Sequence, residues 1–86
     1  MENVTLPSDI NQRVREVIVK TFKPSAEDSR GELRMKSLPG WDSLGHMRLV
    51  VELEQEFVIN FPTYTIAQLL DVESIARIVH SLQIKD

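Results

Sequence analysis

The sequence contains no cysteine. This absence excludes disulfide bonds and thiolate metal ligands, and it suits a reducing compartment. Aromatic residues make up only 6% of the chain, so the core must be mainly aliphatic. No run of eighteen apolar residues and no signal-like segment occurs, so we predict neither a membrane span nor secretion and expect a cytoplasmic protein.

The chain has 86 residues, of which 42% are hydrophobic. This length predicts one domain, residues 1–86, that can fold without disulfide or metal staples if its helices pack well. We expect it to be a monomer. Its two histidines lie far apart in the sequence, and without cysteines they do not form a metal-binding set, so we predict no metal.

An excess of positive charge is also missing, because the net charge is −3. The two halves differ: residues 1–41 have a net charge of +1 and residues 42–86 a net charge of −4. The acidic half disfavours nucleic-acid binding and favours basic partners. Its row of Glu52, Glu54 and Glu56 is equally explained as an ordinary solvated helix face.

Apolar spacing predicts an all-α fold, a small four-helix bundle of three main helices plus a short third helix, with a long loop between helices one and two. The expected helices are a first one capped by Ser8 and ending at Thr21 or Phe22, a second over 43–57, a short third over 65–70 and a fourth over 72–82. The expected apolar side of the first helix consists of Ile10, Val14, Val17, Ile18 and Val19.

The connection over residues 24–40 is long for a compact domain, and long loops often serve function. It contains Leu33, Met35 and Leu38, which we expect to anchor it to the core. Trp41 directly after it is a candidate hydrophobic staple against Met47.

Ser43 follows the turn Leu38-Pro39-Gly40 and precedes a periodic segment that runs to Phe57. Asp42 or Ser43 can cap this predicted helix, so the hydroxyl of Ser43 lies where unpaired backbone N–H groups and the positive end of the helix dipole converge. A phosphate ester on that oxygen would be stabilised there. The alternative is that the two residues form an ordinary cap.

The predicted helix over 43–57 carries two apolar stripes at helical spacing. The first consists of Leu49, Val50, Leu53 and Phe57, and the second of Leu44, Met47 and Val51. One stripe is enough to face a core, so the second, which begins beside Ser43 and is rimmed by Arg48 and Glu52, is a candidate docking surface. The alternative is a helix buried on two sides.

Three stretches together resemble the acyl carrier protein family. They are Gly40-Trp41-Asp42-Ser43-Leu44, then Val50-Val51-Glu52-Leu53-Glu54-Gln55-Glu56-Phe57, and then Phe61-Pro62. The similarity covers residues 33–82, with a plausible first helix before it.

The resemblance implies that Ser43 Oγ, next to Asp42, is the attachment point of 4'-phosphopantetheine, which a magnesium-dependent phosphopantetheinyl transferase takes from coenzyme A. The chain would then be a phosphoprotein, and its prosthetic thiol would carry an acyl group as a thioester. This fits a chain without cysteine, because the thiol must come from the prosthetic group. The carrier would not itself be an enzyme.

The resemblance further implies partners that load and process acyl groups, in fatty acid or polyketide biosynthesis. The expected partner-binding residues are Leu44, Met47, Arg48, Val51, Glu52 and Ile66. An acyl chain is expected to enter between helices along Leu53, Ile66, Leu69 and Ile75.

The sequence departs from the best-known fatty-acid carriers after the serine and in the third helix. Gly45, His46 and Arg48 stand where those carriers usually have acidic residues, and Thr63, Tyr64, Thr65 and Gln68 stand in the expected third helix. These departures favour a dedicated biosynthetic pathway. Gly45 should also weaken the first helical turn by about 1 kcal/mol relative to alanine, so we expect a mobile prosthetic-group end.

Other functions stay open at this point. An aminoacyl or peptidyl carrier would use the same serine, and an unmodified helical interaction module would use the second stripe alone. A small serine hydrolase would use His46 as the base for Ser43, although the residues around Ser43 do not match the G-x-S-x-G spacing. His80 is expected to be a surface or partly packed residue.

Overall fold

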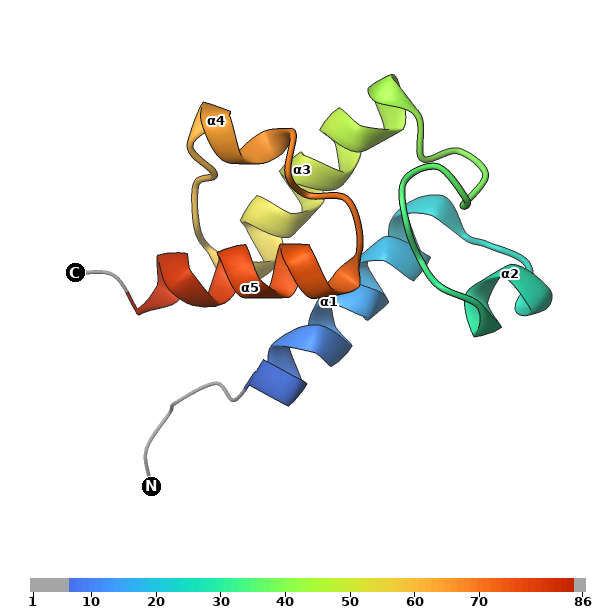
Figure 1. Cartoon of the computed structure of the whole chain (residues 1–86), viewed down its shortest axis with the longest axis horizontal. Coiled ribbons are helices and arrows are strands. Elements are labelled where there is room, and N and C mark those ends of the chain that lie inside the picture. Colours follow the sequence, from blue (N-terminus) through green and yellow to red (C-terminus); the bar gives the residue numbers. More distant parts are fainter. Residues whose placement is uncertain (1–6, 85–86) are drawn as a thin grey trace.

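The computed structural model describes residues 7–84, and side chains from residue 9 onward. Figure 1 shows the all-α arrangement of this part of the chain. Its five helices are α1 (Pro7–Phe22), α2 (Ala26–Arg30), α3 (Ser43–Phe57), α4 (Thr63–Ile66) and α5 (Val72–Gln83). The all-α prediction is therefore confirmed.

The three long helices match the predicted ones within one or two residues, and the short segments differ more. The predicted loop over 24–40 contains the five-residue helix α2, which is capped by Ser25 through a hydrogen bond from the Asp28 N–H to Ser25 Oγ at 3.1 Å. The expected short helix over 65–70 lies instead at Thr63–Ile66. Both corrections concern helices of about one turn, which contain too few residues to show an apolar periodicity.

The helix ends follow from local chemistry. Pro7 stands at the start of α1, where a residue without an N–H is tolerated. Ser8 therefore lies inside α1 and is not its cap, contrary to the sequence prediction. Asp42 caps α3 as expected, and α3 ends at Val58, whose left-handed backbone (φ 54°) stops the helix.

α1 is the helix around which the core is built, because it packs against both α3 and α5. Figure 1 places α4 in the connection between α3 and α5, and places α2 at the end of the molecule away from α4. The buried hydrophobic side chains come from the three long helices and from the connections between them: Ile10, Val14, Val17, Ile18, Leu33, Leu38, Trp41, Leu49, Val50, Leu53, Phe57, Phe61, Leu69, Ile75, Ala76 and Val79. The core is mostly aliphatic, as the scarcity of aromatic residues requires.

The long connection is fixed to the body of the protein at several points. Leu33 and Leu38 are buried, and Met35 is partly buried against the core, so the three predicted anchors are confirmed. The Met35 N–H also donates to the carbonyl of Leu70 at 2.9 Å, next to a single antiparallel bridge between Arg34 and Asp71. The connection that leads to Ser43 is thus held against the segment before α5.

The two stripes of α3 differ in burial as predicted. The first stripe, Leu49, Val50, Leu53 and Phe57, lies entirely in the core. The second stripe stays exposed, by 82% at Leu44, 48% at Met47 and 49% at Val51. The prediction for one residue of α1 is wrong. Val19 is 36% exposed, because it falls outside the face of α1 that the buried residues occupy.

We predict that Leu53→Ala lowers the free energy of unfolding by about 2–5 kcal/mol, because it removes a fully buried side chain and leaves a cavity. Met47→Ala should cost less than about 1 kcal/mol, because Met47 is half exposed. Urea unfolding of both variants measures this difference. Equal and large losses would show that Met47 belongs to the core.

A second prediction concerns the cap of α5. Asp71 Oδ1 accepts the Ser74 N–H at 2.8 Å and the Ser74 hydroxyl at 2.6 Å. These hydrogen bonds to Ser74, helped by nearby Arg34 and Arg77, hold the pKa of the Asp71 carboxyl below its usual 3.8. Asp71→Ala should therefore cost about 1 kcal/mol at neutral pH.

The pH dependence has a defined sign, because a lowered pKa stabilises the folded state only while the carboxylate is ionised. The contribution of Asp71 is complete above its unfolded pKa and is lost as the pH falls through its lower folded pKa. The stability gap between wild type and Asp71→Ala should therefore shrink in urea unfolding between about pH 5 and pH 2. Glu16→Gln, at an exposed position of α1, is the control and should show a small difference throughout.

Candidate functional site

Ser43 is the first residue of α3, and its side chain is exposed. The carboxylate of Asp42 accepts the Gly45 N–H at 2.9 Å, and the Asp42 carbonyl accepts the His46 N–H at 2.7 Å. The N–H groups of Ser43 and Leu44 belong to the first turn, where a helix provides no carbonyl for them. An anion bound to Ser43 Oγ would meet these N–H groups and the positive end of the helix dipole.

A groove runs from the start of α3 along its exposed apolar stripe. It has a volume of about 540 Å³ and is lined by Gly40, Asp42, Leu44, Gly45, Met47, Arg48 and Val51. Four of the predicted partner-binding residues, together with the cap residue, therefore meet in one concave surface next to Ser43. Neither Glu52 nor Ile66 is part of this lining.

Trp41 and His46 form a buried polar contact beneath the start of α3. Trp41 is 2% exposed and stacks on Phe22, with ring centroids 5.4 Å apart. Its indole Nε1–H donates to His46 Nδ1 at 2.9 Å. The aromatic partners of Trp41 are thus Phe22 and His46. The staple of Trp41 against Met47 stays a prediction.

The same histidine connects α3 to α4. His46 Nε2 lies 2.8 Å from the carbonyl oxygen of Ile66. Because an indole can only donate, Nδ1 must accept, so Nε2 carries the proton and donates to Ile66. The neutral ring thereby joins the connection before α3, the first turn of α3 and the end of α4.

Both ring nitrogens of His46 are thus committed to other groups. A proton from Ser43 could enter the ring only at Nδ1, which would break the hydrogen bond from Trp41. The geometry therefore argues against the pair of Ser43 and His46 as nucleophile and base. The structural role of His46 was not predicted from the sequence. One signal was present: Trp41, five residues earlier and just before the helix start, has an indole N–H that can donate to the His46 ring.

Gly45 lies where α3 approaches the preceding turn most closely. A Cβ at this position would come within 2.0 Å of the Gly40 carbonyl oxygen and 2.9 Å of Phe22 Cε1. Gly40 has a φ of +90°, which favours glycine as well. Gly45 is buried, and its missing side chain allows two backbone segments to pack closely. The mobility expected for the helix start stays a prediction.

The three glutamates of α3 all make contacts within the protein. Glu52 pairs with Lys20 of α1 at 3.4 Å, and Glu56 pairs with Arg13 of α1 at 3.2 Å. Glu54 Oε2 accepts the Phe61 N–H at 2.9 Å. The expected acidic face thus serves to join α3 to α1 and to the connection that follows it.

The remaining residues for which the sequence made predictions lie in the core or near the surface. Leu53, Leu69 and Ile75 are fully buried in the core, whereas Ile66 is only partly buried. His80 is partly packed on α5, as expected. Within residues 9–84 no group of three histidine or acidic side chains could hold a metal ion, and none of the helices within 7–84 is long and apolar enough to cross a membrane.

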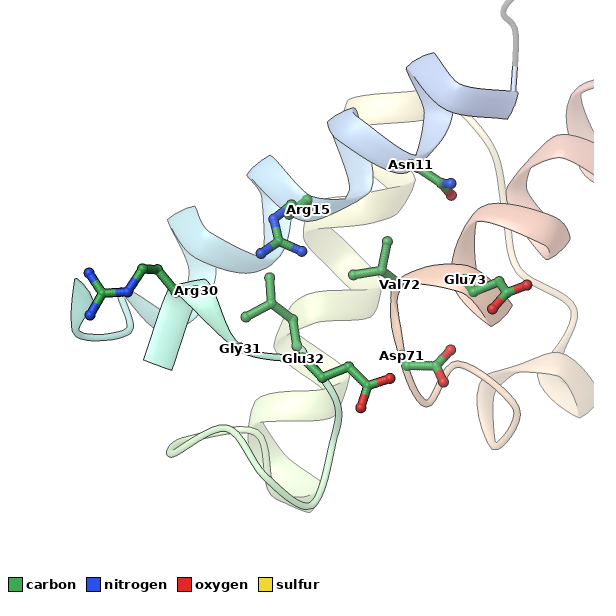
Figure 2. A pocket seen from close by; sticks show the side chains of 9 residues that line it. Asn11, Arg15, Arg30, Gly31, Glu32, Asp71, Val72 and Glu73 are labelled. Atoms are coloured by element: carbon green, nitrogen blue, oxygen red, sulfur yellow. The ribbon is translucent and has the colours of Figure 1, made fainter. Parts of the chain in front are cut away.

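A second pocket, of about 450 Å³, lies between α1, the end of α2 and the start of α5. Figure 2 shows it, and it is lined by Asn11, Arg15, Arg30, Gly31, Glu32, Leu33, Asp71, Val72 and Glu73. Arg15 donates to the carbonyl of Ser29 at 2.8 Å, and Asp71 caps α5. Figure 2 shows Arg30 directed away from the other lining residues. Arg15 and Asp71 thus contact groups within the fold, so we take the groove beside Ser43 as the better candidate site.

No family model matches this chain, and no match is found among solved structures.

We predict that Gly45→Ala destabilises the protein by about 1–3 kcal/mol, because the added Cβ meets the backbone carbonyl of Gly40. Helix propensity alone predicts the opposite, a gain of about 1 kcal/mol. Gly31→Ala is a matched control, because its Cβ would meet the nearest atom at an ordinary 3.7 Å. Urea unfolding decides the sign; a stabilised Gly45→Ala protein would contradict the close packing.

Proposed function

We propose that the protein is an acyl carrier whose Ser43 Oγ bears 4'-phosphopantetheine. The observation that carries the proposal is the exposed Ser43 at the capped start of a 15-residue helix, beside a groove of exposed apolar side chains. The motif Asp42-Ser43-Leu44 and the resemblance of residues 33–82 to acyl carrier proteins support it. The four-helix bundle of that family is part of the proposal, with α1, α3, α4 and α5 as its helices.

The attachment reaction uses the exposed hydroxyl of Ser43. Its Oγ would bond to the phosphorus atom of coenzyme A that carries pantetheine, and the pyrophosphate P–O bond to the nucleotide would break. Adenosine 3',5'-bisphosphate would leave, and the hydroxyl proton of Ser43 would pass to a base of the transferase. The magnesium-dependent transferase supplies the catalytic groups. On the carrier, the N–H groups of Ser43 and Leu44 and the helix dipole would favour the new negative charge.

The carrier presents its cargo and leaves the chemistry to other enzymes. A flexible arm on Ser43 would raise the effective concentration of a thioester at the active site of each docked enzyme. Docking would use Leu44, Met47, Arg48 and Val51 in the groove, with Ile66 and Glu52 beside it. We propose a cytoplasmic monomer that serves a dedicated fatty acid or polyketide pathway.

The other functions differ in what they require of Ser43. An aminoacyl or peptidyl carrier bears the same arm and differs only in cargo. An interaction module needs the groove and no modification. A hydrolase needs a free base, and the hydrogen bonds of His46 to Trp41 and Ile66 oppose that role.

We predict that incubation with coenzyme A, Mg²⁺ and a broad-specificity phosphopantetheinyl transferase adds one phosphopantetheine to the protein. Ser43→Ala should abolish the addition, because the accepting oxygen is gone, while its circular dichroism spectrum stays unchanged. Ser37→Ala, at an exposed position of the connection before α3, should be modified like wild type. Intact-mass spectrometry measures all three proteins.

The outcomes separate the candidate functions. Absence of any addition with several transferases, or an addition that persists in Ser43→Ala, would overturn the carrier assignment. Turnover of an activated ester by the unmodified protein, lost in His46→Gln, would instead support a hydrolase.

A further inference from the structure

The groove beside Ser43 is lined by one cation, Arg48, and one anion, Asp42, although it belongs to the acidic half of the chain. Residues 42–86 carry a net charge of −4, which by itself favours basic partners. Of the charged side chains on α3, however, the three glutamates already contact groups within the protein, as described above. The ionic group that lines the groove on α3 is the guanidinium of Arg48.

Arg48 is exposed, and none of the ion pairs formed within residues 9–84 involves it. The other charged residue of the lining, Asp42, uses one carboxylate oxygen to accept the Gly45 N–H. Glu52, one turn after Arg48, pairs with Lys20 of α1 at 3.4 Å. Arg48 therefore offers a free cation next to exposed Met47 and Val51.

Local charge matters more than net charge for a docked partner. At physiological salt, exposed charges more than about 8 Å apart are largely screened from one another. A side chain seated on Met47 and Val51 thus experiences Arg48 of the same helix more strongly than it experiences Glu73, the acid of α5. An arginine guanidinium binds a carboxylate with two parallel hydrogen bonds, which favours a partner acid over a partner base at this position.

The apolar residues of the groove define the rest of the partner. Leu44, Met47 and Val51 lie on one face of α3 at helical spacing, so they form an elongated surface along the helix axis. Such a surface suits an amphipathic helix whose apolar anchors lie in the groove. The exposed fractions of 82%, 48% and 49% leave enough apolar area for this contact.

We propose that the groove binds an amphipathic helix of a partner protein that places apolar anchors on Leu44, Met47 and Val51 and a carboxylate on Arg48. The inference deepens the proposed carrier function by naming the chemistry of the partner. Its test uses the unmodified full-length chain, so that a failure here and a failure of Ser43 modification are distinguishable.

The test is a display library of amphipathic helical peptides with a fixed apolar face and rim positions randomised among acidic, basic and neutral residues. Selection on wild type should enrich Asp or Glu at the rim, and selection on Arg48→Glu should enrich Lys or Arg. A synthesised peptide selected on wild type should bind Arg48→Gln about three- to fivefold more weakly, the range of an exposed ion pair. Met47→Ala or Val51→Ala should weaken it by about tenfold.

Arg77→Gln is the matched control, because Arg77 is an exposed arginine of α5 outside the groove lining. It should bind the selected peptide like wild type. Enrichment of basic residues on wild type, enrichment of acidic residues on Arg48→Glu as on wild type, or no enriched peptide at all would overturn the proposal. Sedimentation that shows self-association through the groove, lost in Met47→Ala, would assign the surface to a second copy of this chain and would also overturn it.

Discussion

The close approach of the first turn of α3 to the chain before it is the constraint on which the candidate site depends. Gly45 lies against the Gly40 carbonyl, where a Cβ has no room. Beneath it, the neutral ring of His46 accepts from Trp41 and donates to Ile66, so one side chain of α3 satisfies polar groups from two other segments. A buried polar network of this kind is stabilising only while every member is paired. The position of Ser43 therefore depends on side chains that are themselves out of reach of any partner.

The side chains on different faces of α3 have three separate roles. One apolar stripe lies in the core, and the glutamates that follow contact α1 and the chain near Phe61. Only the stripe that begins at Leu44 is left for another molecule. This division explains why the acidic residues of the helix are a poor guide to its partners: a carboxylate that pairs with Lys20 or Arg13 is already partly neutralised. The cation that remains, Arg48, carries more information about recognition than the net charge does.

Much of the fold could be predicted, because apolar residues at helical spacing indicate the three long helices. The bounds of α3 and the opposite burial of Leu53 and Met47 followed from periodicity and a cap alone. The short helices could not be placed in this way: α2 depends on the cap at Ser25, and α4 lies where a single turn leaves no periodic signal. Val19 was misplaced because its apolar character says nothing about which face of α1 meets a neighbour.

The sequence by itself determined the helical class, the cap at Asp42 and the exposure of a serine at the start of an amphipathic helix, because these depend on residues within one or two turns of each other. It also carries the resemblance on which the proposed cofactor rests. Only the tertiary structure decided the roles of Gly45 and His46, since a glycine that weakens an isolated helix is required when a backbone from another segment lies against it. The same holds for the charges of α3, because Glu52 pairs with a residue 32 positions earlier in the chain and Glu56 with one 43 positions earlier.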